Sequence, residues 1–210
     1  MYKDTLNINI GCGHKAATDW KNFDSSPTLL LEKIPILSKL FKINENTFPK
    51  NVLFGDITKK ILCEPNAAEN IYCSHTLEHM SREEMIIALN NIFIMLKPGG
   101  VFRVVVPSLE SRIKKYHENN DADLFMDSLH MGEKFKNNFI DKIRSIFGNS
   151  KHKWMYDDVT LHKHLKNAGF RNIRKCFFLD SKKECFSNVE QHSRFLEPGL
   201  LEATAYQATK

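Results

Sequence analysis

Residues 69–106 read ENIYCSHTLEHMSREEMIIALNNIFIMLKPGGVFRVVV, and this stretch carries the strongest secondary-structure pattern of the chain. Ser81 and Glu84 form a capping box, which predicts that a helix begins there. The apolar stripe of that helix consists of Met85, Leu89, Ile92, Phe93 and Leu96, and Pro98, Gly99 and Gly100 end it. The apolar runs on either side predict two strands, and VFRVVV is typical of a strand buried on both faces of a parallel sheet.

The same stretch contains HTLEH, which matches the H-x-x-E-H pattern of the inverted-motif zinc peptidases. That chemistry requires both imidazoles on one face of a helix, one turn apart. Because Ser81 caps the helix, His75 lies before it, at the tip of the preceding strand, and is not stacked over His79. The sequence places no third ligand, so we predict that zinc does not explain the motif and that the chain has no metal site.

Composition excludes several classes of protein. The chain has 210 residues and a net charge of +5, and its basic residues are scattered, which is more typical of a solvated surface than of a specific nucleic-acid interface. The five cysteines contain no C-x-x-C pair, so a disulfide framework or a cysteine-based zinc site is not expected.

Neither a secretory signal nor a membrane span is expected. The opening residues MYKDTLNINIGCG are polar where a signal peptide is apolar, and no apolar run reaches about 18 residues, so a cytoplasmic location is expected. Segment 28–43 is apolar and basic, and Pro35 divides it. It is predicted to pack on the domain or to cover a site, with weak contact to a membrane surface left open.

Strands and helices alternate along the rest of the chain, which predicts one α/β domain over 1–210 with a mainly parallel sheet. Further strands are predicted in the ranges 6–10, 22–24, 51–57, 172–179 and 200–206. Helices are predicted over 108–119, 133–148 and 157–170, with a polar link between the first two and with Gly169 closing the last.

Polar residues and glycines follow four consecutive predicted strands, at the edge where an open parallel sheet binds ligands. They are Gly11, Cys12 and Gly13, then Asp24, then Asp56 and Ile57, then Ser74 and His75. Glycines permit close approach of the backbone to a ligand, and carboxylates accept hydrogen bonds from hydroxyl or amino groups. The alternatives are that Asp24 is a turn residue, that Asp56 caps a helix, and that His75 is a hydrogen-bonded buried histidine.

A dinucleotide site fits the sequence poorly. The chain has no G-x-G-x-x-G motif, and the first acid after Gly13 that follows a predicted strand is Asp24, much closer than the spacing of about 20 residues in that fingerprint. NAD is therefore disfavoured.

Several motifs occur together in an order that identifies a family. They are LNINIGCG, DWKNFDSSP, SHTLEH, LKPGGVFRVVVPSLE, HKWMYDDVTLHKHLKNAGF and LEATA. The chain resembles the class I, Rossmann-like methyltransferases that depend on S-adenosylmethionine (SAM), in particular a small stand-alone group often linked to surface-polysaccharide pathways. The resemblance implies a mainly parallel seven-stranded sheet with an antiparallel last strand and helices on both faces. It also implies a cofactor-binding half, 1–107, and an acceptor-side half, 108–210.

The resemblance assigns roles to the residues at the strand tips. Gly11, Cys12 and Gly13 would pass under the methionine part of SAM, and Asp24 would hold the ribose. In the same alignment of motifs, Asp56 and Ile57 would contact the adenine, and Ser74 and His75 would lie near the sulfonium. The chain departs from the group at the first loop, which lacks a third glycine, and at Ser108, where the group often has an acid.

The acceptor side is less well defined. A hydroxyl acceptor benefits from a general base, for which His75 and His79 are the first candidates and His152 is the next. Trp154 and Tyr156 are candidates for an acceptor wall.

Arg112 is a further candidate for a contact to the substrate. The alternatives are a surface role for His152, ordinary packing for the two aromatic residues, and a solvated helix face for Arg112.

The sequence also narrows the chemistry of the acceptor. SHTLEH does not contain the Asn/Asp-Pro-Pro-aromatic tetrad of methyltransferases that modify DNA bases, so a base acceptor is disfavoured. The resemblance implies a small-molecule or glycan acceptor, methylated on oxygen. A SAM-binding or partner-binding domain of the same fold without activity is the alternative.

Overall fold

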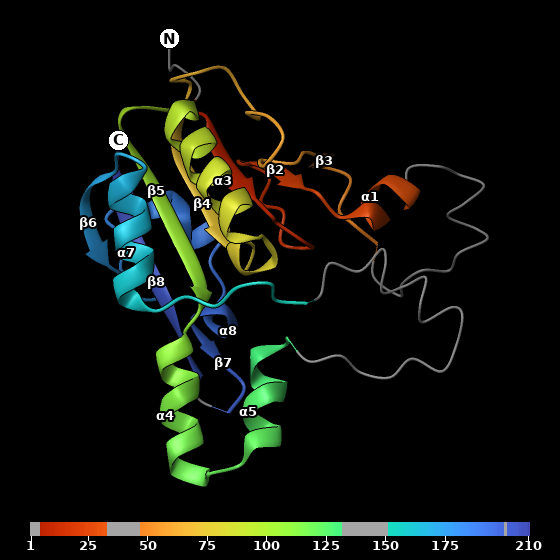
Figure 1. The fold of residues 1–210 in the computed structure, drawn as a ribbon. Helices are drawn as coiled ribbons and strands as arrows, with labels where there is room; N and C mark the ends of the chain where they lie inside the picture. Colours follow the sequence, from red (N-terminus) through yellow and green to blue (C-terminus); the bar gives the residue numbers. More distant parts are fainter. Residues whose placement is uncertain (1–4, 33–46, 132–150, 200) are drawn as a thin grey trace.

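The computed structural model describes residues 5–32, 47–131, 151–199 and 201–210. Seven strands form one sheet in the order β3-β2-β1-β4-β5-β8-β6 (Figure 1). Their bounds are Asn7–Ile10 (β1), Lys21–Asp24 (β2), Val52–Phe54 (β3), Ala68–Ser74 (β4), Leu96–Pro107 (β5), Arg171–Lys175 (β6) and Leu201–Thr209 (β8). A short strand, β7 (Leu196–Glu197), pairs with β8 outside this path.

The direction of the strands confirms the predicted Rossmann-like sheet. β1 pairs in parallel with β2 and β4, and β2 with β3 and β4 with β5 do the same. β8 inserts between β5 and β6 and is antiparallel to both. The carboxyl ends of the first five strands therefore lie at one edge of the sheet, which is where ligands bind in such folds.

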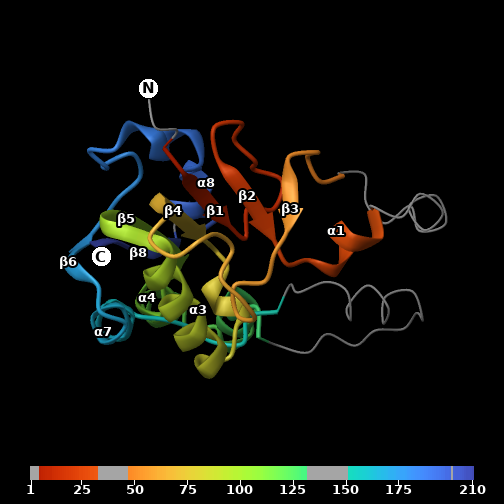
Figure 2. The ribbon, with the colours of Figure 1, turned by 90° about the horizontal axis from the view of Figure 1, so that it is seen from above.

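Helices cover both faces of the sheet. α3 (Arg82–Met95) and α7 (Asp158–Asn167) lie on one face, whereas α8 (His192–Phe195) lies on the other, as the view from above shows (Figure 2). Side chains of β4 divide accordingly, because alternate residues of a strand point to opposite faces. Ile71 and Cys73 join the core that includes residues of α3, and Tyr72 joins a second core.

In β1, asparagine and isoleucine side chains alternate between the two faces of the sheet. Ile8 and Ile10 are buried in the core on the α3 side, whereas Asn7 and Asn9 are buried in the opposite direction. The two asparagine side chains are satisfied by neighbouring strands, since Asn7 accepts from the Asn70 amide at 2.8 Å and Asn9 donates to the Asn22 side chain at 3.3 Å. Amide pairs thus link β1 to both of its neighbours.

The capping box at the start of α3 is confirmed. The Ser81 hydroxyl accepts a hydrogen bond from the Glu84 backbone N–H at 3.2 Å, and the Glu84 carboxylate accepts one from the Ser81 N–H at 2.7 Å. This box starts the helix at Arg82, with only Met80 and Ser81 between it and His79, so the chain between β4 and α3 is short.

Replacing Ser81 by Ala should lower the free energy of unfolding by about 1 kcal/mol, because one N–H of the first turn loses its acceptor. Urea denaturation followed by circular dichroism measures the change. Ser81→Thr keeps the cap oxygen and is the matched control, with an expected loss of a few tenths of a kcal/mol. Equal losses in the two variants would contradict this assignment.

Two helices follow β5 and extend beyond the sheet (Figure 1). α4 (Leu109–Asn119) agrees with the prediction, but α5 (Ala122–Leu129) occupies a stretch predicted to be a polar link, and that prediction was wrong. The Asp121 carboxylate caps α5 by accepting from the N–H groups of Asp123 and Leu124, both at 3.0 Å. The helix is amphipathic but too short to stand out by periodicity alone.

The remaining predictions for secondary structure have mixed outcomes. α7 ends as expected, with Gly169 at φ +98° just after it, and the loop 11–20 contains no helix. α1 (Pro27–Glu32) begins the predicted amphipathic segment, whereas its part from 33 to 43 and the predicted helix 133–148 lie outside the described residues. Within the described ranges, no helix combines the length and the apolar character needed to cross a membrane.

Candidate functional site

A cavity of about 230 Å³ opens at the tips of β1 and β4, where the sequence predicts the cofactor. Its lining comprises Asn9, Gly11, Cys12, Gly13, His14, Lys15, Tyr72, Ser74, Val189, Gln191 and Arg194. The last three come from a segment between β6 and β7 for which the sequence suggested no role. That segment includes a 3-10 helix, η2 (Glu184–Asn188), and α8. The cavity is thus closed by residues from both halves of the chain.

The two glycines of the first loop serve different purposes. Both have positive φ values, +65° at Gly11 and +54° at Gly13. A Cβ on Gly11 would lie 2.0 Å from the Thr76 hydroxyl, so this glycine permits contact between the tips of β1 and β4. A Cβ on Gly13 would have no neighbour within 4 Å, so the backbone there is open to an incoming ligand.

Gly11→Ala should lower the free energy of unfolding by about 1–2 kcal/mol, because an L-residue is strained at this φ and Thr76 must move. Gly13→Ala carries the same backbone strain without the clash and is the matched comparison. Thermal and urea denaturation of the two variants measure the difference. A Gly11 variant as stable as the Gly13 variant would show that the contact with Thr76 is not tight.

Asp24 lies at the end of β2 beside the first loop. Its carboxylate accepts a hydrogen bond from the Gly13 N–H at 2.9 Å and another from the Ser26 N–H at 2.8 Å. Each carboxylate oxygen still has acceptor capacity, because it can accept more than one hydrogen bond. Asp24 therefore orders the glycine loop and is also placed to bind hydroxyl groups of a ligand.

Of the two residues predicted to contact adenine, Asp56 is partly exposed and Ile57 is buried. Asp56 accepts from the Thr58 N–H at 3.0 Å and the Thr58 hydroxyl at 2.6 Å. Burial alone would raise the pKa of Asp56, but these hydrogen bonds and Lys59 outweigh it, so the pKa lies below its usual value. Ile57 is only 2% exposed and packs in the main core. Contact of either with adenine stays a prediction.

Two polar groups of β4 line the cavity. The Tyr72 hydroxyl and the Ser74 hydroxyl are buried, and apart from their interaction with each other, neither has a hydrogen-bond partner among the described residues. Residues two apart on a strand share a face, so both groups point to the side that carries the cavity. Buried hydroxyls without a partner are costly, so a polar ligand that supplies one is favoured here.

The three histidines predicted as base candidates lie around Glu78, a residue of the 3-10 helix η1 (Leu77–His79). His75 Nδ1 and His79 Nε2 are 3.6 and 3.9 Å from a Glu78 carboxyl oxygen. The rings of His79 and His152 are 5.1 Å apart. The structure therefore brings all three histidines together around Glu78, a residue of HTLEH that no local pattern marks as part of a site.

Burial shifts the pKa of each group in this cluster toward the uncharged form. It lowers the pKa of His75 to about 4 and that of His152 to about 3, and it lowers the pKa of His79 as well. Burial also raises the pKa of Glu78 to about 8. The three imidazoles are therefore neutral near pH 7 and have unprotonated nitrogens available.

The other predicted acceptor contacts lie in different places. Trp154 is 43% exposed and borders a cavity of about 380 Å³ between α3 and α7. Tyr156 is fully buried, and its hydroxyl donates to the Leu77 carbonyl at 3.4 Å. Arg112 is also buried and binds the carboxylate of Glu197 at 2.6 Å. Tyr156 thus packs in the core, and Arg112 forms a buried ion pair, so the solvated helix face considered for Arg112 is wrong. Contact of either residue with an acceptor stays a prediction.

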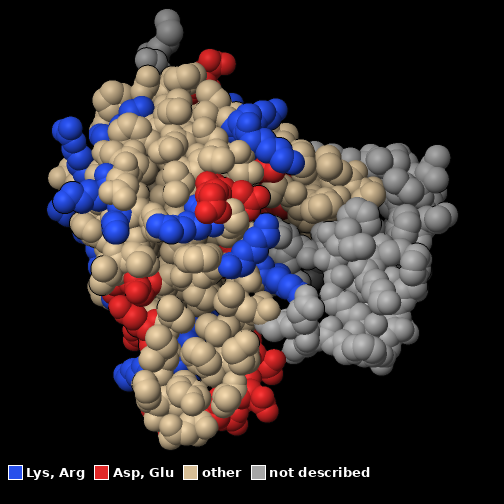
Figure 3. All heavy atoms as spheres, in the orientation of Figure 1, with Lys and Arg blue, Asp and Glu red and all other residues tan. Residues whose placement is uncertain are grey.

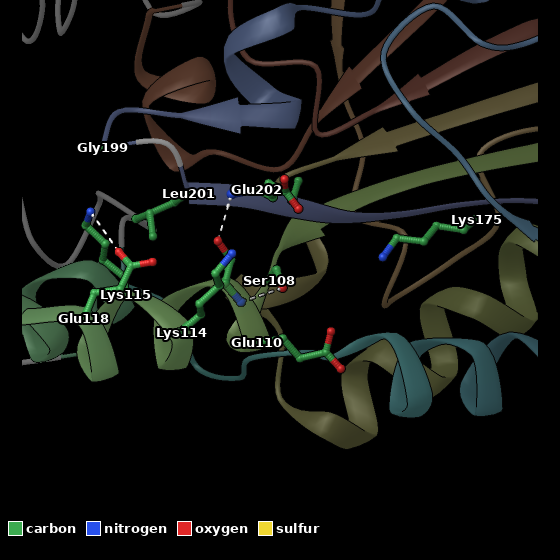
Figure 4. A pocket seen from close by; sticks show the side chains of 11 residues that line it. Ser108, Glu110, Lys114, Lys115, Glu118, Lys175, Gly199, Leu201 and Glu202 are labelled. Carbon is green, nitrogen blue, oxygen red and sulfur yellow. Dashed lines mark hydrogen bonds and ion pairs between the residues drawn. The ribbon is translucent and has the colours of Figure 1, made fainter.

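A third cavity, of about 470 Å³, lies between α4 and the start of β8 (Figure 4). Its charges are mixed, with Lys114, Lys175 and Glu110 pointing toward it. Ser108 caps α4 by accepting from the Ser111 N–H at 3.2 Å. On the face of the molecule shown in Figure 3, basic side chains are likewise interrupted by acidic ones, which supports the view that they form a solvated surface.

Comparisons with known proteins agree with this architecture. A family model described as a methyltransferase domain matches residues 10–175, and a search of curated proteins finds no match. Among solved structures, the chain is similar to a SAM-dependent methyltransferase from Archaeoglobus fulgidus, with 17% identity, a TM-score of 0.51, and coverage of 98% of this chain and 86% of that one.

Two further structures show the same likeness. For a protein of this class from Methanosarcina mazei the identity is 13%, the TM-score 0.55 and the coverage 100% and 94%. For one from Thermotoga maritima the identity is 16% and the TM-score 0.51, and the match covers 98% of this chain and 82% of that one. At such identities the likeness shows the fold, and the family model spans most of the chain.

Proposed function

This chain belongs to the methyltransferase domain family, and from that premise we propose that it moves a methyl group from SAM to a hydroxyl of a small-molecule or glycan acceptor. Its cofactor is SAM, which supplies, when bound, an electrophilic methyl group on a positively charged sulfur. The protein's task in such a transfer is to orient the acceptor, to exclude water and to accept a proton.

The cavity at the tips of β1 and β4 carries the cofactor part of this proposal. Its open backbone at Gly13 admits a ligand, and its buried Tyr72 and Ser74 hydroxyls require polar partners. Asp24 adds a carboxylate beside the same loop. SAM has an amino acid end and a ribose that meet these needs, so the residues present fit the cofactor.

The histidine cluster carries the acceptor part. His75 adjoins Ser74 of the cavity, and its Nε2 lies 2.8 Å from the carbonyl of Arg194, which also borders the cavity. The cluster is therefore next to the place proposed for the cofactor. Neutral imidazoles can accept a hydrogen bond or a proton from a hydroxyl, which favours transfer to oxygen.

The division of labour along the chain follows from these positions. We assign cofactor binding mainly to 1–107 and acceptor contacts mainly to 108–210, although Val189, Gln191 and Arg194 border the cofactor cavity. A glycan acceptor and a cytoplasmic location rest on the sequence alone, and so does the absence of a specific nucleic-acid partner. Contact of segment 28–43 with a membrane surface likewise rests on the sequence alone.

Turnover with a mixed pool of acceptors tests the proposal. The full chain is incubated with SAM and extracts rich in nucleotide sugars and small hydroxylated compounds, and release of S-adenosylhomocysteine is followed. Methylated products are then identified by mass spectrometry. We expect an O-methylated product, whereas SAM binding without turnover across all pools would favour the alternative of an inactive SAM-binding domain. An N-methylated product would overturn the assignment to oxygen.

A further inference from the structure

The environment of Glu78 does not suit a free carboxylate. The side chain is fully buried at the tip of β4, and neither carboxyl oxygen has a hydrogen-bond partner among the described residues. Its nearest polar neighbours are nitrogens of His75 and His79, at 3.6 and 3.9 Å. The described surroundings contain no arginine or lysine paired with this carboxyl group.

The hydrogen bonds of the histidines show which of their nitrogens carry lone pairs. His79 Nδ1 is 3.0 Å from the Lys151 carbonyl, and His75 Nε2 is 2.8 Å from the Arg194 carbonyl. A carbonyl can only accept, so each of these nitrogens donates its hydrogen. In the neutral rings, the other nitrogen of each histidine has an unshared pair and faces Glu78.

His152 completes the group. Its Nδ1 is buried without a hydrogen-bond partner among the described residues. One ligand atom from each of Glu78, His79 and His152 lies within 4.8 Å of the others. The Glu78 carboxyl oxygens and the unprotonated nitrogens of the histidines therefore face the same small volume. If Glu78 were protonated, its one hydrogen could bond to only one of these nitrogens.

We propose that Glu78, His79 and His152 bind a divalent transition-metal ion, with Zn²⁺ the best match. Two imidazoles and one carboxylate are a ligand set of catalytic zinc sites, which keep a fourth position open. Nitrogen ligands favour Zn²⁺ over Mg²⁺ and Ca²⁺, which prefer oxygen. The Lys151 carbonyl orients the His79 ring, as outer-shell acceptors do in metal sites.

These ligands differ from the two histidines of the H-x-x-E-H motif. His75 and His79 do not lie on one helical face, whereas Glu78 and His79 are neighbours on η1. The third ligand, His152, comes from the stretch before α7. His152 N–H donates to the His130 carbonyl at 3.2 Å, and the Glu78 carbonyl accepts from the N–H of Lys153 at 2.7 Å, so backbone hydrogen bonds fix this stretch beside η1.

The location of the site gives the ion a role, and this role rests on the proposed function. His75 links the cluster to the cofactor cavity through Ser74 and Arg194. An acceptor hydroxyl that occupies the open position would have its pKa lowered by the ion and would lose its proton to solvent more easily.

Metal binding is tested without SAM or acceptor. The full chain, free of any affinity tag, is stripped with a chelator and titrated with Zn²⁺ by calorimetry, and bound metal is counted by mass spectrometry. Co²⁺ serves as a spectroscopic probe of four-coordinate geometry. We expect one tightly bound ion per chain. No bound ion, or a Co²⁺ spectrum of the hydrated ion only, would overturn the proposal.

Variants locate the site. Glu78→Gln and His152→Gln should each weaken Zn²⁺ binding by more than about a hundredfold, because loss of an outer-shell partner alone costs about 10–100-fold. His162→Gln, an exposed histidine of α7, is the matched control and should bind as the parent does. Circular dichroism checks folding, and the half-buried His152 keeps the test valid if the Glu78 variant does not fold. Unchanged binding in a folded His152 variant would overturn the ligand set.

Experiments can contradict the metal site and the proposed methyl transfer independently of each other. A chain that binds one Zn²⁺ through these residues but methylates no hydroxyl contradicts the proposed function and leaves the metal site standing. A chain that releases S-adenosylhomocysteine equally well before and after chelation, with no ion bound, contradicts the metal site alone. Loss of turnover on chelation with SAM affinity retained would support both.

Discussion

Replacing Arg103 by Met should lower the free energy of unfolding by about 3–5 kcal/mol, since it leaves a buried carboxylate without its partner. Arg103 and Glu190 are fully buried or nearly so and form an ion pair on the face of the sheet opposite α3. Arg103 also pairs with Asp180 at 2.9 Å. Without the guanidinium, the one hydrogen bond that Glu190 keeps among the described residues is that from the Leu179 N–H, at 2.7 Å.

Arg174→Met is the matched control. Arg174 binds the same Asp180 at 2.7 Å, but its side chain is 41% exposed, so its removal should cost less than about 1 kcal/mol. Urea denaturation of both variants gives the comparison. Equal losses would show that burial adds nothing to the Arg103 pair. Replacing Arg103 by Met and Glu190 by Leu together should restore much of the stability, because no buried charge is then left alone.

The ion pair between Arg103 and Glu190 should also affect cofactor binding. Glu190 lies between Val189 and Gln191, which border the cavity at the tips of β1 and β4. The anchoring of Glu190 on Arg103 therefore positions one wall of that cavity. The Arg103 variant, if folded, should bind SAM more weakly than the Arg174 variant does, and calorimetry with SAM measures this.

Asp24→Ala should weaken SAM binding by about 1–3 kcal/mol, which is up to a loss of about a hundredfold in affinity. Two causes act together. The carboxylate is placed to accept from ribose hydroxyls, and it also accepts from the Gly13 N–H at 2.9 Å and so orders the loop. Asp24→Asn keeps one acceptor oxygen and should give an intermediate loss.

The control for Asp24 is Asp19→Ala. Asp19 is in the same connection between β1 and β2, but it is exposed and binds the Asn188 side chain at 2.8 Å, outside the cavity. Its removal should leave SAM affinity unchanged. An Asp24→Ala variant that is folded and binds SAM as the parent does would show that this carboxylate has only a structural role.

Much of the fold could be predicted because its signals are local. The capping box at Ser81 and Glu84 set the start of α3, and the alternation of Ile and Asn set the faces of β1. The antiparallel last strand came from the resemblance and not from the residues, because LEATA alone shows no direction. These features are encoded within a few neighbouring residues or within a shared motif order.

What the sequence did not reveal depends on long-range contacts. The sequence suggests Tyr156 as part of an acceptor wall, yet it is in the core, because the stretch before α7 is hydrogen-bonded to η1. Glu78 stood in plain view in HTLEH, but only its burial beside His152 makes it notable. The cavity wall formed by Val189, Gln191 and Arg194 depends on Arg103 of β5, which is distant in the sequence, so no local pattern predicts it.

The central position of β8 has a consequence for synthesis. β8 fills the gap between β5 and β6 and pairs with β5 from Pro107 to Val101. During synthesis, β5 and β6 therefore each have an unpaired edge until β8, which ends at Thr209, has emerged from the ribosome. Chaperone protection of those edges should matter most before β8 has emerged, because exposed strand edges associate with other chains.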